Sequence, residues 1–395
     1  MRFAHIADVH LGGWRQPELQ QLNLEYFKKA IETCLSENVN FILFSGDLFD
    51  SAYPPIEILK ETFSEFKKLK EQKIKCYIIA GSHDYSVSGK TFLEVLEKAG
   101  FCEICKFSEQ ESDAGKKILL KAHNHEGVSI YGYSGKKSGL EIEDLKNISL
   151  EESNNFKILM LHTTMTSAKG TLPIESVDIE SLPKADYYAL GHLHLIHEYI
   201  ISDNKYLIYP GPIFPNNFQE LEDLGKGSFY IIDINGYVKL TKKEIKLKEI
   251  LVLNLEIENS ITATDKIISE LENQNLQDKI LLLRLKGIIK QGKTTDIDFE
   301  KIQEKAKEKG VYVFLKNTSK LKTEETEIEV KTDNIDEIEN NLVEDFVKNN
   351  SSQFNQFIQP LLNSLSLEKQ EDEKSAIFES RLLSEMNKIL NLELE

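Results

Sequence analysis

The hydrophobic positions of the first 230 residues fall into two alternating patterns. Short, continuously apolar runs, too short for exposed helices, indicate strands at 3–7, 41–44, 76–80, 158–161 and 187–190. Between them, apolar residues recur at three- and four-residue steps through 18–37 and again after Pro54-Pro55, which is typical of amphipathic helices. The region 130–237 is richer in strands. We therefore predict an α/β (α+β) fold with a mixed sheet or a two-sheet sandwich, flanked by helices.

A second unit is predicted after the lysine-rich stretch 239–248. Strand patterns at 251–257, 280–285 and 311–315 alternate with helical patterns at 264–272 and 298–309, which predicts a small βαβαβ domain. Residues 316–340 are polar and mixed in charge, as linkers are. The predicted boundaries are therefore 1–248 for the first domain, 249–316 for the second, 317–340 for a linker and 341–395 for a helical region.

The helical region carries apolar stripes along 338–365 and 377–390. No third predicted element covers these two amphipathic helices, so they favour a surface for a partner protein. Packing of both helices on the body of the same chain is the alternative. From Ile335 to Glu395 there are 13 acidic and 5 basic side chains, a net −8 of the chain's −17. A basic surface elsewhere is compatible with such an acidic tail, so the total charge does not exclude nucleic acid.

The composition argues against a membrane-spanning, secreted or disulfide-rich protein. The 395 residues are 41% hydrophobic, and no apolar run approaches the roughly 18 residues of a membrane span. The first residues lack the basic start and apolar stretch of a signal peptide. Four cysteines are too few for a disulfide framework in a chain this long. These features predict a cytoplasmic protein, associated with the nucleoid in a prokaryote, and no membrane partner.

Five of the predicted strands end in residues that can hold a metal ion. These are Asp8 and His10, Asp47, Ser82 with His83, His162, and His192 with His194. In α/β sheets the functional edge lies at the carboxyl ends of the strands, so residues scattered over 190 positions are expected to converge there. A lone histidine is usually structural, but ligand-type residues at five equivalent places indicate a metal centre.

Carboxylate and imidazole ligands together suit manganese, iron or zinc rather than calcium. If two ions bind, one carboxylate must bridge them, and Asp47 is the candidate because it is central in the set. A pair of ions can bind a phosphate oxygen, lower the pKa of a shared water and hold an in-line displacement, which predicts phosphoester hydrolysis. Acyl transfer fits poorly, since the sequence has no Gly-x-Ser-x-Gly elbow.

The motifs D-x-H, G-D-L-F-D, G-S-H-D, H and G-H-L-H, spread over residues 8 to 194, resemble those of the calcineurin-like metallophosphoesterases. The runs at 185–192 and 209–212 (Tyr-Pro-Gly-Pro) are similar to one branch in particular. That branch is the nuclease of double-strand-break repair, the SbcD or meiotic recombination eleven family. The resemblance implies a metallophosphoesterase sandwich whose second domain is a DNA-facing cap.

The resemblance also implies the roles of individual residues. Two manganese ions per chain are expected, with other divalent transition metals as alternatives. One ion would be held by Asp8, His10, Asp47 and His194, and the other by Asp47, His162 and His192. His83 would act on the leaving oxygen, and Asp50 would orient its ring. The family commonly has asparagine where this chain has Ser82, whose shorter hydroxyl would be a ligand of the second ion directly or through a water molecule.

The partners implied by the resemblance are DNA and a coiled-coil ATPase of the SbcC type, docked on the C-terminal helices. A homodimer through the helices 18–37 and 55–70 is also expected, since their apolar faces can pair between chains. Two other functions stay open. One is a phosphatase or cyclic-nucleotide phosphodiesterase, although the arginine that follows the second aspartate in many phosphoprotein phosphatases is Ser51 here. The other is a non-catalytic DNA-repair scaffold, which would have no need of His83.

Overall fold

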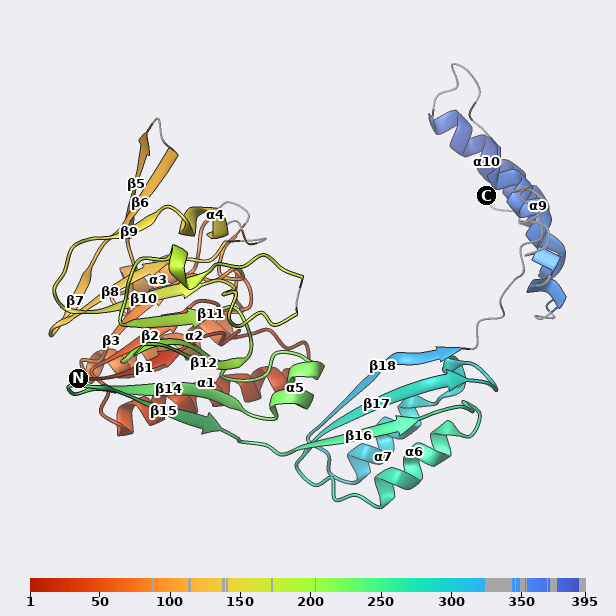
Figure 1. The fold of residues 1–395 in the computed structure, drawn as a ribbon. Helices are drawn as coiled ribbons and strands as arrows, with labels where there is room; N and C mark the ends of the chain where they lie inside the picture. The colour runs from red at the N-terminus through yellow and green to blue at the C-terminus, as the bar shows by residue number, and fades with distance from the viewer. Residues whose placement is uncertain are drawn as a thin grey trace. The chain divides into compact units, whose positions relative to one another are not determined.

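The computed structural model describes residues 1–86, 89–112, 115–136, 139, 141–171, 173–202, 204–323, 343–344, 346–348, 352, 354–367, 369 and 375–390. Residues Met1–Thr323 form one compact unit and Glu324–Glu395 a second. Each unit is described by itself below (Figure 1).

Two six-stranded sheets form the body of the first unit. In order across it, the first sheet contains β15 (Val238–Ile245), β14 (Gly227–Ile234), β1 (Arg2–Ile6), β2 (Phe41–Ser45), β3 (Lys75–Ile79) and β4 (Glu103–Ile104). The second contains β12 (Ile196–Ser202), β13 (Lys205–Pro210), β11 (Tyr187–Gly191), β10 (Phe156–His162), β8 (Val128–Tyr133) and β7 (His123–His125). Neighbouring strands are parallel from β1 to β4 and from β8 to β13, and antiparallel towards the edges.

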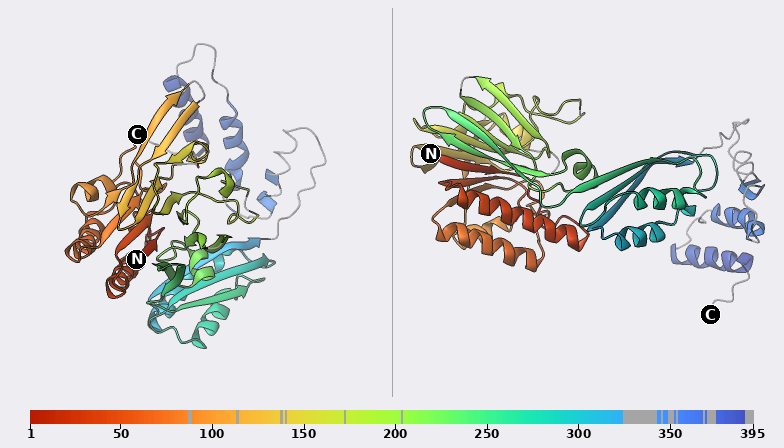
Figure 2. Two further views of the ribbon diagram at one scale, coloured as in Figure 1. Left: turned by 60° about the vertical axis from the view of Figure 1, so that its left-hand side comes forward. Right: turned by 90° about the horizontal axis from the view of Figure 1, so that it is seen from below.

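The hydrophobic core lies between the two sheets. Large side chains of the first sheet, such as Phe3, Phe41 and Tyr77, meet Met160 and Tyr187 of the second, and all are buried. The outer face of the first sheet is covered by α1 (Pro17–Ser36), α2 (Ile56–Glu71) and α3 (Leu93–Lys98). Figure 2 shows the first two of these helices lying together on one outer side of the sandwich. The prediction of a two-sheet sandwich flanked by helices is confirmed.

The outer face of the second sheet has a thinner cover. A small sheet of β5 (Phe107–Ser112), β6 (Gly115–Leu120) and β9 (Ile148–Leu150) packs there together with α4 (Glu141–Leu145) and the short helix η2 (Ile179–Ser181). One further helix, α5 (Phe218–Leu224), follows β13. It begins at Asn217, whose side chain accepts a hydrogen bond from the Glu220 amide, and ends at Gly225 in a left-handed conformation.

The cap domain is the predicted βαβαβ unit. Its parallel sheet contains β16 (Ile250–Glu256), β17 (Ile280–Ile289) and β18 (Val313–Thr323), connected by α6 (Ala263–Glu272), η3 (Thr294–Asp296) and α7 (Phe299–Glu308). One face of the sheet packs on its helices through residues such as Leu283 and Ile302. From the other face, Ile280 and Leu282 join the core around α1. Cap and sandwich are therefore in direct contact.

The predicted boundary between cap and linker at residue 316 is wrong. β18 continues to Thr323, pairing with β17 beyond a register shift, and Leu321 is buried in the cap core. The polar composition of 317–323 gave the linker prediction, but an edge strand exposes one side and tolerates polar residues there. Residues 324–340 of the predicted linker lie outside the described residues.

The C-terminal unit contains α9 (Asn355–Leu365) and α10 (Ser375–Leu390), which contact each other. Several of its large apolar side chains are exposed, namely Phe346, Phe354, Leu365, Leu367 and Leu383. Among the helices that the structure describes, none has the length and apolar character needed to cross a membrane.

The helices predicted to form a homodimer have only part of their apolar surface available. Leu19 and Leu22 are completely buried in the core of a single chain, so these two side chains are not available for pairing between chains. Phe63 is partly buried against the same core. By contrast, Tyr53 and Ile56, at the start of α2, are 75% and 79% exposed. The exposed apolar side chains in this part of the chain therefore include two near the beginning of α2.

Candidate metal centre

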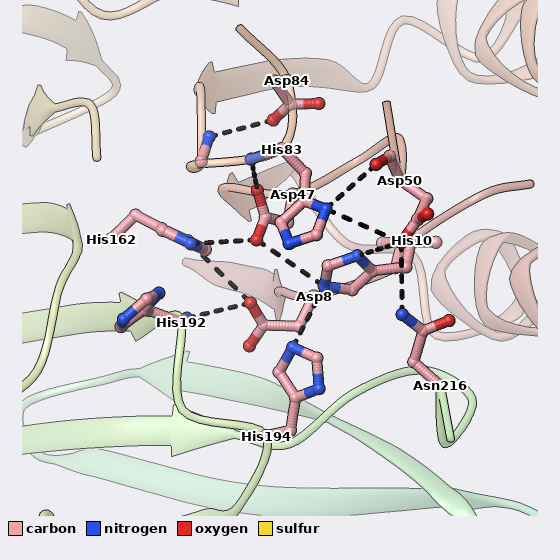
Figure 3. A network of polar contacts seen from close by, with 12 residues as sticks. Asp8, His10, Asp47, Asp50, His83, Asp84, His162, His192, His194 and Asn216 are labelled. Atoms are coloured by element: carbon pink, nitrogen blue, oxygen red, sulfur yellow. Dashed lines mark hydrogen bonds and ion pairs between the residues drawn. The ribbon is translucent and has the colours of Figure 1, made fainter. Parts of the chain in front are cut away.

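The ligand-type residues meet at one edge of the sandwich, where the parallel strands of both sheets end. Asp8 follows β1, Asp47 follows β2, and His83 follows β3. From the second sheet, His162 ends β10, and His192 and His194 follow β11. The expected convergence at the carboxyl ends is therefore present, and Figure 3 shows the side chains pointing towards one another.

The backbone at this edge is strained. Asp8, His10, Asp47 and His192 have φ of 51°, 47°, 49° and 94°, in the region that residues with a side chain rarely adopt. Main-chain hydrogen bonds hold the turns, since the amides of Val9 and His10 both donate to the Asp47 carbonyl at 2.9 and 3.0 Å. Such conformations persist only where the surroundings impose them, and they cluster at functional sites.

Two glycines of the motifs are required by close packing. A Cβ on Gly191 would lie 2.1 Å from the Ser45 carbonyl oxygen, and one on Gly81 would lie 2.1 Å from Asp47 Oδ1. Neither contact is sterically allowed. The glycines therefore let the loops after β3 and β11 approach the ligands of neighbouring strands.

The first ligand cluster consists of Asp8, His10 and His194. His10 donates its Nδ1 hydrogen to Asp50 Oδ1 at 3.0 Å, and His194 donates its Nδ1 hydrogen to Glu220 Oε1 at 2.8 Å. In the neutral rings, both Nε2 atoms then carry lone pairs, and these atoms face each other at 3.0 Å. Two lone pairs aimed at one point repel unless a cation lies between them, so this cluster fits a metal ion.

The second cluster consists of Asp8, Asp47 and His162. His162 donates its Nδ1 hydrogen to the Ser45 carbonyl at 2.9 Å, which directs Nε2 towards Asp47 Oδ2 at 3.1 Å. Oδ2 of Asp8 is buried and has no hydrogen-bond partner in the part of the chain that the structure describes. A buried carboxylate oxygen without a partner is costly, and a cation would satisfy it. This cluster therefore also fits a metal ion.

The electrostatics of the protein without metal agree with this fit. Burial alone would lower the pKa of His162, but the Asp47 carboxylate raises it to about 10. Burial likewise opposes the charged form of His194, yet its hydrogen bond to Glu220 brings its pKa up to about 9. Burial raises the pKa of Asp8. The pocket thus holds positive charge in the form of protons, which divalent cations would displace.

Two predicted ligands are placed differently from the others. The main-chain amide of His192 donates to Asp8 Oδ1 at 2.9 Å, while its ring packs edge-on against His162 with centroids 5.1 Å apart. Its imidazole belongs to neither cluster, and burial lowers its pKa to about 4. Ser82 is partly buried, and among the described residues its hydroxyl has no hydrogen bond. Asp8 lies in both clusters, and Asp47 Oδ2, from the residue expected to be the shared carboxylate, lies 3.1 Å from His162 Nε2 and 3.6 Å from His10 Nε2.

His83 lies at the open side of the centre, with its side chain 48% exposed. Its Nδ1 donates to the main-chain carbonyl of Asp50 at 2.9 Å, and the Asp50 carboxylate lies 3.7 Å away. The ring is therefore oriented mainly by the Asp50 carbonyl, whereas its carboxylate binds His10 directly. Asp50 thus supports His10 of the first cluster as well as the expected His83.

Three supporting residues were not singled out from the sequence. Asp84 is buried and accepts from the amides of Phe49 and Gly81, which ties the loops after β2 and β3 together. Burial, and the Asp47 charge after it, raise the pKa of Asp84 to about 7. Asn216 donates to Asp50 Oδ1 at 3.2 Å, and Glu220 holds His194. In the sequence, the place of Glu220 three residues after Asn217 marks the start of a helix but does not link it to His194.

A two-sheet sandwich with overlapping clusters of carboxylates and histidines at its edge is the arrangement expected of a metallophosphoesterase. Residues 1–195 match the calcineurin-like phosphoesterase family. The ligand clusters of these residues fit a dinuclear metal site of the kind that this chemistry uses.

The similarity to curated proteins narrows the class further. The chain is 34% identical to the DNA double-strand break repair protein Mre11 of Methanocaldococcus jannaschii over 288 residues, 68% of this chain and 73% of that protein. It is 25% identical to the Mre11 of Archaeoglobus fulgidus over 97% of this chain and 85% of that protein. For the Mre11 of Sulfolobus acidocaldarius the values are 27%, 73% and 76%. The chain belongs to the Mre11 family, as the motifs predicted.

Proposed function

We propose that the protein is a manganese-dependent DNA phosphodiesterase that acts in double-strand-break repair with a coiled-coil ATPase. The observation that carries the proposal is the pair of overlapping ligand clusters in a chain of the Mre11 family. Mixed carboxylate and imidazole ligands suit manganese, with iron and zinc as competitors. When bound, two such ions would polarise a phosphodiester and activate a water molecule.

In this scheme the protein orients the ligands and supplies an acid. Asp50 and Glu220 fix the tautomers of His10 and His194, so that both Nε2 atoms are ligands. His83 keeps its Nδ1 hydrogen bonded to the Asp50 carbonyl, which leaves Nε2 directed away from that anchor. When protonated, the ring can donate a proton from Nε2 to the departing 3′ oxygen.

The test compares cleavage with metal binding in the same variants. His83→Ser should lower manganese-dependent nicking of supercoiled plasmid by about 10²- to 10⁴-fold, the usual contribution of a general acid. Manganese binding, measured by calorimetry, should stay unchanged, because His83 is not a ligand in this scheme. His123→Ser is the matched control. His123 lies on β7, at the edge of the second sheet, and binds Glu103 of β4. Its loss should change neither nicking nor manganese binding. Loss of both ions in His83→Ser would refute the assigned role.

A phosphatase or cyclic-nucleotide phosphodiesterase would use the same centre. Hydrolysis of bis(p-nitrophenyl) phosphate alone does not separate these functions, so plasmid and a phosphoserine peptide should be compared at equal enzyme concentration. Turnover of the peptide without nicking would favour the phosphatase. Manganese binding without either activity would favour a non-catalytic scaffold.

The C-terminal helices are proposed as the ATPase contact. Exposed side chains such as Phe354, Leu365 and Leu383 give this unit an apolar surface suited to a groove in a partner. We further propose a homodimer formed at the beginning of α2, where Tyr53 and Ile56 are exposed. Light scattering of a Tyr53→Ser/Ile56→Ser variant should show monomers at concentrations where the unchanged protein dimerises.

A further inference from the structure

Helix α5 contacts both the metal centre and the cap domain. At its beginning, Glu220 accepts hydrogen bonds from His194 Nδ1 at 2.8 Å and from the Asn216 amide at 2.7 Å. The side chain of Asn216 donates to Asp50, which in turn holds His10. The residues that begin α5 therefore support both histidines of the first ligand cluster.

The other side of α5 binds one residue of the cap, Arg284 of β17. Arg284 Nε lies 3.1 and 3.0 Å from the two carboxylate oxygens of Glu222, and its Nη2 also binds Glu222. Nη2 donates to Gln219 Oε1 at 2.8 Å, and the guanidinium lies over the Phe218 ring at 5.0 Å. Three residues of one short helix thus hold the same side chain.

This contact is buried, which makes it sensitive to the position of the cap. The Arg284 side chain is only 6% exposed and that of Glu222 16%. A buried guanidinium that loses its carboxylate partner is left without compensation, so the two domains cannot separate here without a large cost. The two-point geometry also fixes orientation, which a single ion pair would not do. Leu221, between the two sides of the helix, is fully buried in the sandwich core.

We propose that Arg284 is a positioning residue for the first metal site, acting through α5. The cap holds Glu222 and Gln219 in place, the helix carries Glu220 with it, and Glu220 fixes the tautomer and direction of His194. The second ligand cluster has no such dependence, because His162 is oriented by the Ser45 carbonyl of the adjacent strand β2. The placement of the cap therefore sets the affinity of one of the two metal sites.

The coupling must also act in reverse. If the Arg284 contact increases metal affinity at the first site, metal bound there strengthens the contact between cap and α5 by the same factor. A partner or a DNA substrate that draws the cap away from α5 would weaken the hold on His194. The inference rests on the proposed metal site but not on DNA cleavage, so it is tested by binding alone.

The test is manganese titration of the full-length protein by calorimetry, with variants of three residues. Glu220→Gln should weaken one of the two binding steps about 10- to 100-fold, as loss of such a supporting carboxylate usually does. Arg284→Gln should weaken the same step by a smaller factor, about 3- to 10-fold, since it acts through the helix. In both variants the other step should keep its affinity, which a general loss of structure would not allow.

Controls separate positioning from stability. Lys279→Gln removes an ion pair with Glu249 at the start of the same cap sheet without touching α5, and should leave both binding steps unchanged. If Arg284→Gln does not fold, Arg284→Lys decides the question, because it keeps the buried charge but loses the two-point contact with Glu222. An unchanged first step in whichever of these variants folds, or equal weakening of both steps, would overturn the inference. Selective weakening would support it even in a protein that cleaved no DNA.

Discussion

His5 should make the protein sensitive to acid, and its replacement by glutamine should remove that sensitivity. The side chain is completely buried on β1, between the two sheets, where its Nδ1 lies 3.0 Å from the Tyr187 hydroxyl. Its Nε2 has no hydrogen-bond partner among the described residues. Burial lowers the pKa of His5 from 6.5 to about 3. The ring is therefore neutral in the folded protein above about pH 3.

The size of the effect follows from the two pKa values. Above pH 6.5 the ring is neutral in both states, and it adds no pH dependence. Between pH 6.5 and about 3 the unfolded chain binds a proton that the folded protein cannot, so stability falls as the pH falls. At pH 5 the loss is about 2 kcal/mol, from 1.36 kcal/mol per pH unit over the interval from 6.5 to 5.

The measurement is urea unfolding of the unchanged protein and of His5→Gln, both free of metal, at pH 8.5, 7.5 and 5.0. Glutamine can still reach the Tyr187 hydroxyl, and any loss of packing is independent of pH. The difference in unfolding free energy between the two proteins should be constant from pH 8.5 to 7.5. It should then shift by about 2 kcal/mol in favour of the variant at pH 5.0. A shift below about 0.5 kcal/mol would show that His5 is charged or hydrated in the folded state, against the reasoning from burial.

Three further outcomes are expected. Asp47→Ala should remove at least one manganese ion in a calorimetric titration, because it leaves His162 without the carboxylate beside it; a fully active variant would exclude the two-metal scheme. Gly191→Ala should lower the free energy of unfolding by about 1 to 3 kcal/mol, since its Cβ would meet the Ser45 carbonyl at 2.1 Å, and an unchanged thermal midpoint would contradict this packing. Deletion of Ile335–Glu395 should leave a soluble protein that keeps manganese-dependent nicking but no longer co-purifies with the ATPase. Because the deletion removes a net charge of −8, DNA affinity should rise modestly at low salt. An insoluble product would show that these residues belong to the core.

The fold could be predicted because its strands and helices differ in the spacing of their buried hydrophobic residues. Strands such as Phe41–Ser45 are buried at every position, and α1 alternates buried and exposed positions at helical spacing. The end of the cap could not be predicted in this way. Strand β18 is polar beyond Leu315 because it pairs on one side only, and polarity alone does not separate an edge strand from a linker.

The residues that meet at this edge could be predicted from the sequence, but not the way they are grouped. Strand ends identify which residues reach the edge of the sandwich, while the depth of each side chain depends on backbone turns that the sequence does not reveal. The left-handed turn at Asp8 brings its carboxylate into both clusters, whereas a shared position was expected only for Asp47, which lies beside a histidine of each cluster. Glu220 could not be recognised as a support for His194, because an acidic residue in the first turn of a helix is common for reasons of helix stability alone.

The two ligand clusters differ in how firmly their histidines are held in place. Around Asp47 and His162 the supports are main-chain groups: the His83 amide donates to Asp47 Oδ1 at 2.8 Å, and the Ser45 carbonyl holds His162. Ser45 is the last residue of β2, so its carbonyl cannot move without disturbing the sheet. Around His10 and His194 the supports are the carboxylates of Asp50 and Glu220, which lie on loops and on a short helix. Side chains on loops and short helices can reorient at a small cost. A conformational change elsewhere in the protein is therefore expected to displace His194 before it displaces His162.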